Sequence, residues 1–174
     1  MVYTGARDAS PESIPPHPER DGHRDFICAM HNISISGPVQ MVANNLELAG
    51  CRRLLDVGGG PGTYSIALCQ KYPGLTTVVF DRPDTLTITR EAIAQFGLEG
   101  RIIPQEGDWN QENYGDDYDA VLFSNVLHGP TSGALDKLRK AHAALNPGGR
   151  LIVHDFLLNN EKTGPLGAAL FNMM

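Results

Sequence analysis

The sequence predicts an α/β domain built on a doubly wound, mostly parallel sheet, and three observations support this prediction. Short apolar runs alternate along the chain with segments in which apolar residues recur at helical spacing. The apolar runs are continuous rather than alternating, as expected of strands that are covered on both faces. A glycine cluster follows the first run and precedes a helical pattern, which is the order of a strand, a tight turn and a helix. Right-handed crossovers between such strands place helices on both faces of one open sheet.

The first 50 residues contain helical patterns but no strand pattern. Residues 1–24 include four prolines among charged side chains, which predicts a flexible arm or linker. Over residues 24–48, apolar side chains recur at helix-like intervals. Gly37 and Pro38 divide this segment into two predicted helices, because proline is favoured in the first turn of a helix. We therefore assign residues 25–50 to a pair of helices that precede the sheet.

The remaining domain, residues 51–174, is predicted to contain five strands and three helices. The predicted strands span residues 52–57, 75–80, 101–104, 120–124 and 150–156. The predicted helices span residues 63–72, 83–96 and 131–145. Asn146 begins the sequence Asn-Pro-Gly-Gly, which marks the end of the last helix and a turn, because proline cannot continue a helix and glycine readily adopts the left-handed conformation.

Composition and charge limit the classes of function. The 174-residue chain has a formal net charge of −6 and a pI of about 5.4, which argues against nucleic acid as its main partner. No apolar stretch is long enough for a membrane span, and no leader pattern is present. The three cysteines are widely spaced and form no CxxC pair, so neither a zinc site nor a disulfide framework is predicted and a cytoplasmic location is expected. The six histidines form no HxH or HxxxH pair, so no metal site is predicted.

The most informative segment is LLDVGGGPGTYSIAL, residues 54–68. Gly58, Gly60 and Gly62 can adopt positive φ and leave no side chain between the backbone and a ligand. Asp56 ends the preceding strand beside this loop, where its charge would repel a pyrophosphate. A threonine also stands where a dinucleotide fingerprint needs its third glycine or alanine. S-adenosylmethionine, which carries an ammonium and a sulfonium group, is the candidate ligand that suits Asp56 best.

Two further acids follow predicted strands. Asp81 ends the second strand, 25 residues after Asp56, and its carboxylate is able to accept hydrogen bonds from both hydroxyls of a ribose. A helix N-cap ahead of Pro83 is the alternative for Asp81. Asp108 follows the third strand and is a candidate acceptor for an adenine amino group, with Trp109 stacked on the adenine ring.

Five motifs occur in the chain in a specific order and spacing: DVGGGPG (56–62), VVFDRP (78–83), GDW (107–109), SNVLH (124–128) and ALNPGGRLIVHDF (144–156). With them, the sequence resembles the S-adenosylmethionine-dependent O-methyltransferases of the caffeate, hydroxyindole and polyketide-tailoring type. The upstream segment FICAMHNIS (26–34) is similar to the substrate-side helix of that family. The resemblance covers residues 25–174. It implies a Rossmann-like class I methyltransferase fold, S-adenosyl-L-methionine as cofactor, and a substrate-side position for residues 25–50.

Members of that family also have an N-terminal helical dimerisation domain and two more strands, which complete a seven-stranded sheet. Neither feature is found in these 174 residues, so we expect a domain that lacks the last two strands. For the full-length form, the resemblance implies a homodimer. It also implies a small phenolic or polyketide-like substrate with a hydroxyl group, and we expect no nucleic-acid or membrane partner.

The resemblance implies that His128, at the end of the fourth predicted strand, is the general base. An imidazole titrates in the useful pH range and can remove the proton of a phenol, although a histidine that caps the strand end is the alternative. Asp155 aligns with the acid that orients this histidine, or is a surface acid at a strand end. Ser124 lies in the same motif as the histidine and is expected to contact the cofactor. Gly129 and Pro130 replace the usual Asp-Trp of the family, which predicts an altered loop.

Two other classes of function remain open from the sequence. One is a cofactor-binding module without turnover, which product formation with a panel of phenols distinguishes from an enzyme. The other is a nicotinamide-linked oxidoreductase, which the position of Asp56 and the glycine spacing disfavour.

Overall fold

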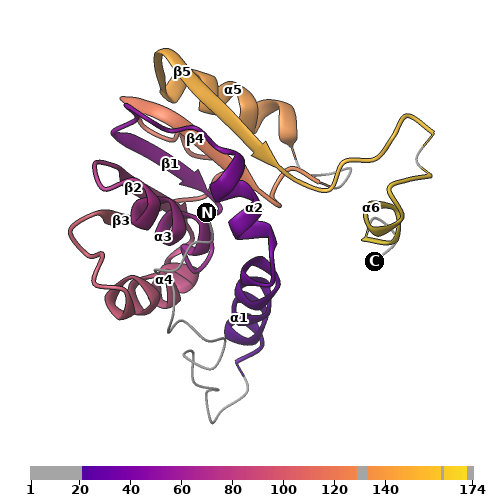
Figure 1. Ribbon diagram of the computed structural model, residues 1–174, viewed down its shortest axis with the longest axis horizontal. Coiled ribbons are helices and arrows are strands. Elements are labelled where there is room, and N and C mark those ends of the chain that lie inside the picture. Colours follow the sequence, from indigo (N-terminus) through magenta and orange to yellow (C-terminus); the bar gives the residue numbers. More distant parts are fainter. Residues whose placement is uncertain (1–20, 129–132, 162, 172–174) are drawn as a thin grey trace.

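In the part of the chain that the structure describes, five strands form one parallel sheet in the order β3-β2-β1-β4-β5 (Figure 1). This computed structural model describes residues 21–128, 133–161 and 163–171. The strands are β1 (Arg53–Val57), β2 (Thr76–Asp81), β3 (Ile102–Glu106), β4 (Tyr118–Ser124) and β5 (Leu145–His154). The strand order reverses direction at β1, where the chain crosses from β3 to β4, so the predicted doubly wound parallel sheet is confirmed.

Within the described residues, six helices connect or flank these strands. They are α1 (Gly22–Ile35), α2 (Pro38–Asn45), α3 (Thr63–Lys71), α4 (Pro83–Gln95), α5 (Ala134–Ala144) and α6 (Leu166–Phe171). The predicted break at Gly37 and Pro38 is confirmed, because Pro38 occupies the first turn of α2. α6 lies away from the sheet, beyond the end of β5 (Figure 1). None of the described helices has the length and apolar character needed to cross a membrane.

Most element boundaries differ from the prediction by one or two residues, and the differences at α1 and β5 are the most informative. α1 begins at Gly22, inside the predicted arm, because the Asp21 side chain caps it by accepting hydrogen bonds from two backbone amides. β5 begins at Leu145, where one residue pairs with β4 before a bulge, and regular pairing resumes at Arg150. β5 ends at His154 rather than at residue 156. Residues 1–20, and the predicted start of the helix at residue 131, lie outside the described part of the chain.

The core lies on both faces of the sheet, as expected for a doubly wound fold. Leu55 of β1 packs in one cluster with Ala141 of α5, whereas Leu54 packs in another with Leu68 of α3. Because side chains alternate along a strand, Asp56 shares the face of Leu54 and lies under α3. The alternation therefore directs an ionisable group into the interior beside the glycine loop.

Candidate active site

The residues predicted to form the site gather along one edge of the sheet. The strands are parallel, so their carboxyl ends meet at that edge, which is where open α/β sheets bind ligands. The residues placed there are Asp56 at the end of β1, Asp81 at the end of β2, Asp108 and Trp109 after β3, Ser124 and His128 at the end of β4, and Asp155 after β5.

The glycine loop between β1 and α3 has the predicted backbone. Gly58, Gly60 and Gly62 have φ values of 67°, 56° and 78°, a region that other L-residues rarely adopt. A Cβ atom on Gly58 would lie 2.8 Å from Cγ1 of Val126 and 3.2 Å from Cζ3 of Trp109. A side chain at Gly58 is therefore excluded twice, by the backbone conformation and by the two neighbours that close over the loop.

Asp56 is fully buried beneath the loop. Its Oδ2 atom accepts a hydrogen bond of 2.8 Å from the hydroxyl of Ser65, while its Oδ1 atom is buried without a hydrogen-bond partner. A Cβ atom on Gly59 would lie 2.8 Å from Cγ of Asp56, so the loop backbone rests directly on the carboxyl group. Burial raises the pKa of Asp56 to about 7, the Ser65 hydroxyl opposes this, and the nearby Asp81 adds to it. Asp56 thus lies under the loop, and the loop backbone separates its carboxyl group from solvent.

Asp81 holds the glycine loop from the neighbouring strand. Its two carboxylate oxygens accept hydrogen bonds from the backbone N–H groups of Gly60, at 2.9 Å, and Arg82, at 2.8 Å. Arg82 rather than Asp81 is the N-cap residue of α4, which argues against the capping alternative. Burial raises the pKa of Asp81, and the two backbone hydrogen bonds oppose the rise.

Asp108 and Trp109 lie beside the same loop, but they face different groups. The Asp108 carboxylate accepts hydrogen bonds from the amide of Asn110, at 2.8 Å, and from the side chain of Gln111, at 2.9 Å. The hydrogen bond from Asn110 lowers the pKa of Asp108. Asp108 therefore closes its own turn, whereas the indole of Trp109 packs over Gly58.

The structure brings His128 and Asp155 together across the ends of β4 and β5. Nδ1 of His128 lies 2.8 Å from Oδ1 of Asp155, and Oδ2 of Asp155 accepts a hydrogen bond of 2.8 Å from the amide of Leu127. The side chain of Asp155 is 3% exposed and that of His128 is 35% exposed. A carboxylate on Nδ1 favours the tautomer protonated there, which leaves Nε2 as the proton-accepting nitrogen.

A second histidine, His154, was not identified as a site residue from the sequence. Its Nδ1 atom lies 3.0 Å from the hydroxyl oxygen of Ser124 and 3.4 Å from that of Tyr64. Burial lowers the pKa of His154, and the adjacent Asp155 opposes this. Ser124, predicted to contact the cofactor, thus contacts His154, which also contacts Tyr64. The signal that could have found this cluster is the parallel register, which pairs Ser124 with His154.

Helix α1 is attached to the start of the glycine-loop helix. His31 is buried, and its Nδ1 atom lies 2.9 Å from the hydroxyl oxygen of Thr63, the first residue of α3. Burial lowers the pKa of His31. Arg24 at the other end of α1 forms two hydrogen bonds with Glu91 of α4. α1 therefore lies along the carboxyl edge, next to the loop that follows β1.

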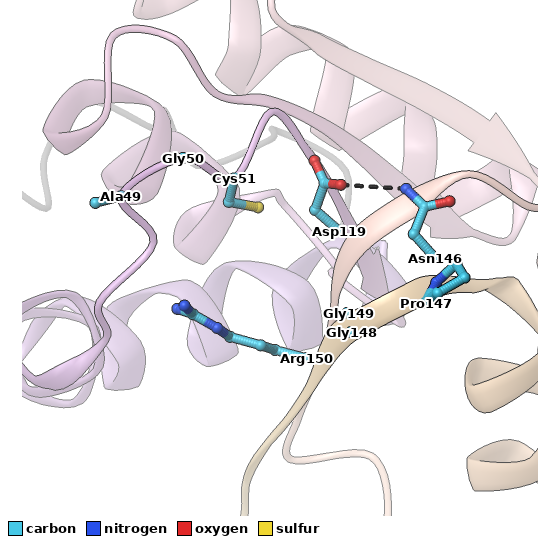
Figure 2. Close-up of a pocket in the computed structure, with 9 residues that line it drawn as sticks. All are labelled: Ala49, Gly50, Cys51, Asp119, Asn146, Pro147, Gly148, Gly149 and Arg150. Carbon is cyan, nitrogen blue, oxygen red and sulfur yellow. Dashed lines mark hydrogen bonds between the residues drawn. The ribbon is translucent and has the colours of Figure 1, made fainter.

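A surface hollow of about 240 Å³ lies at the opposite, amino edge of the sheet (Figure 2). It is lined by Ala49, Gly50, Cys51, Asp119, Asn146, Pro147, Gly148, Gly149 and Arg150. Asp119 accepts hydrogen bonds there from the side chain of Asn146 and from the amides of Arg52 and Arg53. Because the candidate acids and His128 lie at the other edge, we place the active site by its chemistry rather than by this hollow. Within the described ranges, no cluster of three histidine, cysteine or acidic side chains is arranged to hold a metal ion.

Comparison with known proteins identifies relatives across almost the whole described chain. The sequence profile of the O-methyltransferase domain matches residues 19–174. The chain is 36% identical to a 3-hydroxy-5-methyl-1-naphthoate 3-O-methyltransferase of Streptomyces sahachiroi, over 77% of this chain and 39% of the relative. It is 38% identical to an L-tyrosine C(3)-methyltransferase of Streptomyces lavendulae, over 75% of this chain and 36% of the relative. The chain thus spans less than two fifths of the length of these curated relatives.

The fold is also that of solved methyltransferases. The structure of the S-adenosylmethionine-dependent methyltransferase SibL, in its apo form, superposes with a TM-score of 0.74 and 36% sequence identity. The match covers 84% of this chain and 43% of SibL. The predicted class I methyltransferase fold is therefore confirmed.

Proposed function

The chain belongs to the O-methyltransferase domain family, and from this premise we propose that it binds S-adenosyl-L-methionine and methylates a hydroxyl of a small phenolic or polyketide-like molecule. His128 is the general base in this proposal and Asp155 orients it. The observation that carries the proposal is the 2.8 Å contact between His128 and Asp155 at the carboxyl edge of the sheet.

The carboxyl edge fits this cofactor in its loop and in its charge. A Cβ atom on Gly60 would have no neighbour within 4 Å, so the loop backbone is open to a ligand there. Two acids, Asp56 and Asp81, lie directly under that backbone, and each adds negative potential beneath it when it is ionised, which for Asp56 requires a pH above about 7. In our proposal Asp81 accepts hydrogen bonds from the ribose hydroxyls, and Trp109 stacks on the adenine ring. Asp108 accepts a hydrogen bond from the adenine amino group, and Ser124 also contacts the cofactor. When bound, the cofactor supplies a methyl group on a positively charged sulfur.

The role of this chain in the proposed reaction is to remove one proton from the acceptor hydroxyl. In our proposal Nε2 of His128 takes the proton of the acceptor hydroxyl, and the Asp155 carboxylate on Nδ1 stabilises the resulting imidazolium. Asp155 keeps its position because it accepts hydrogen bonds from the amides of both Leu127 and Phe156. The imidazole is thus oriented before the substrate arrives.

The atom that receives the methyl group is a further question within the same site. A deprotonated phenol is nucleophilic at its oxygen and at the adjacent ring carbons. One relative is named as an O-methyltransferase and another as a C-methyltransferase, and removal of a phenolic proton serves both reactions. We propose the oxygen as acceptor, and the mass and NMR spectra of the product distinguish the two.

Three further proposals concern the helices before the sheet, the oligomeric state and the cellular location. We propose that residues 25–50 lie on the substrate side, which the contact between His31 and Thr63 supports. A homodimer of the full-length form and a cytoplasmic location remain proposals, the first from the family resemblance and the second from the cysteine pattern.

The test compares His128→Ala with the unaltered chain, using S-adenosylmethionine with a panel that includes 3-hydroxy-5-methyl-1-naphthoate, simple phenols and L-tyrosine. We expect turnover to fall by roughly 10²–10⁴-fold, as for loss of a general base. The affinity for S-adenosylhomocysteine, measured by calorimetry, should stay the same. His142→Ala, which removes an exposed histidine of α5, is the matched control.

Three outcomes would contradict the proposal in different ways. Equal turnover by His128→Ala and the unaltered chain would exclude His128 as the base. A large loss of cofactor affinity would make His128 a structural residue of the rim. Tight binding of the cofactor by the unaltered chain, without product from any phenol, would favour a binding module without turnover.

A further inference from the structure

One peptide group next to His128 is held from both ends by opposite charges. The carbonyl oxygen of Val126 accepts a hydrogen bond of 3.3 Å from Nζ of Lys137. The N–H of Leu127, which belongs to the same peptide unit, donates to Oδ2 of Asp155 at 2.8 Å. The other oxygen of that carboxylate contacts His128. A cation, a peptide, an anion and the imidazole therefore form one continuous chain of contacts.

Lys137 is buried to a degree that is unusual for a lysine. It lies on α5 and is 5% exposed, and an ammonium group is rarely buried unless it is paired. Burial lowers its pKa, and the negative charge of Asp108 opposes this. Arg139 on the same helix shows the ordinary arrangement, because it is 69% exposed and pairs with Asp136 at the surface. The buried ammonium group of Lys137 thus contrasts with the exposed guanidinium of Arg139 on the same helix.

The same ammonium group also faces the proposed adenine region. Nζ of Lys137 lies 6.0 Å from the ring centroid of Trp109, within the range of a cation–π interaction. Trp109 and Val126 are the two side chains that close over Gly58. Lys137 therefore contacts both of the segments that pack on the first glycine of the loop.

We propose that Lys137 is a positioning residue that sets the geometry of the general base and of the cofactor loop together. It acts on His128 through the Val126–Leu127 peptide and Asp155, and on the cofactor loop through Trp109 and Val126. This inference rests on the proposed function of His128, but the contacts themselves exist without substrate. Loss of the cation leaves the Val126 carbonyl without this donor, so the peptide turns more easily and the hydrogen bond from Leu127 to Asp155 opens more often.

The test replaces Lys137 with methionine, which keeps the length and apolar character of the stem without the charge. In the ligand-free chain we expect hydrogen exchange of the Leu127 amide to accelerate by about tenfold, with no acceleration for the Val121 amide in the middle of β4. Trp109 is the single tryptophan, so its fluorescence spectrum should shift as well. Lys137→Arg, which retains a cation, should restore most of both signals. Arg139→Met removes an exposed cation from the same helix and should change neither.

The exchange and fluorescence measurements do not require turnover, so they are independent of the test on His128. Unchanged exchange at Leu127 in Lys137→Met would overturn the proposal, and so would equal acceleration at Leu127 and Val121, which indicates a general loss of stability. If Lys137→Met does not fold, Lys137→Gln is measured in the same way, with the same expected and contradicting results. In an active enzyme, Lys137→Met should lower kcat and weaken binding of S-adenosylhomocysteine, while Arg139→Met should leave both unchanged.

Discussion

The two edges of the sheet differ in how their polar groups are paired. At the amino edge, beside the hollow, the Asp119 carboxylate accepts three hydrogen bonds from protein groups, and the hydrogen bond from Arg52 is the main cause of its lowered pKa. At the carboxyl edge, burial raises the pKa of Asp56 and Asp81, and one oxygen of Asp56 has no hydrogen-bond partner. His128 lies at this second edge, with a carboxylate on its ring nitrogen.

The surface hollow therefore lies at one edge of the sheet, whereas the groups suited to binding and catalysis lie at the other. In the hollow at the amino edge, the carboxylate of Asp119 is already paired with protein donors, so a ligand would gain little from it. The carboxyl edge has buried carboxyl groups with raised pKa values and an unpaired oxygen on Asp56, and perturbed pKa values are common at functional sites. The next three predictions test how substitutions at each edge change the stability of the fold and the binding of the cofactor.

The largest expected effect is on the pH dependence of stability in Asp56→Asn. Asp56 titrates near 3.8 in the unfolded chain and near 7 in the folded one, so between these values the folded state holds the extra proton. The free energy of unfolding should therefore fall as the pH rises from 4 to 7, by up to about 4 kcal/mol. The asparagine variant lacks this contribution, so its stability relative to the unaltered chain should increase over the same range.

Urea unfolding at pH 5 and pH 8 measures this difference. Both proteins retain Asp81, whose charge interacts with that of Asp56, so the difference reports the titration of Asp56 together with its coupling to Asp81. Parallel curves, with the same difference in unfolding free energy at both pH values, would show that Asp56 is ionised in the folded state and that its burial is compensated by groups other than Ser65.

The next effect is on cofactor affinity in Asp81→Ala. The substitution removes an acceptor from the proposed ribose site and frees the loop amide of Gly60. We expect the affinity for S-adenosylhomocysteine to fall by about 1–3 kcal/mol, because charge-assisted hydrogen bonds are lost. Titration calorimetry measures the change. Equal or tighter binding of NAD by the unaltered chain would contradict the assignment of the cofactor.

The smallest effect is expected at the amino edge in Asp119→Ala. The backbone amides of Arg52 and Arg53 lose their acceptor, but they lie near solvent and can turn to water. The free energy of unfolding should fall by about 1 kcal/mol. Affinity for S-adenosylhomocysteine should stay within about twofold, as for a substitution remote from the site. A larger loss of affinity would mean that the two edges are coupled through β4.

The sequence alone predicted the features that depend on neighbouring residues. The apolar runs and helical spacings predicted the parallel sheet, and Gly37 with Pro38 predicted the break between the first two helices. The glycines at 58, 60 and 62 predicted the positive φ values of the loop, because few other residues tolerate them. Such features are local, so the pattern of a few consecutive residues is sufficient to specify them.

Only the tertiary structure decided which distant groups meet. Asp56 was expected beside a ligand, but the alternation of β1 and the close approach of Gly59 bury it under the loop. The cluster around His154 depends on the register between β4 and β5, and the burial of Lys137 depends on how α5 packs beneath Trp109. The contact between His128 and Asp155 joins residues 27 positions apart in the chain. Register and packing are set by the summed burial of many side chains, so no short sequence pattern determines these contacts.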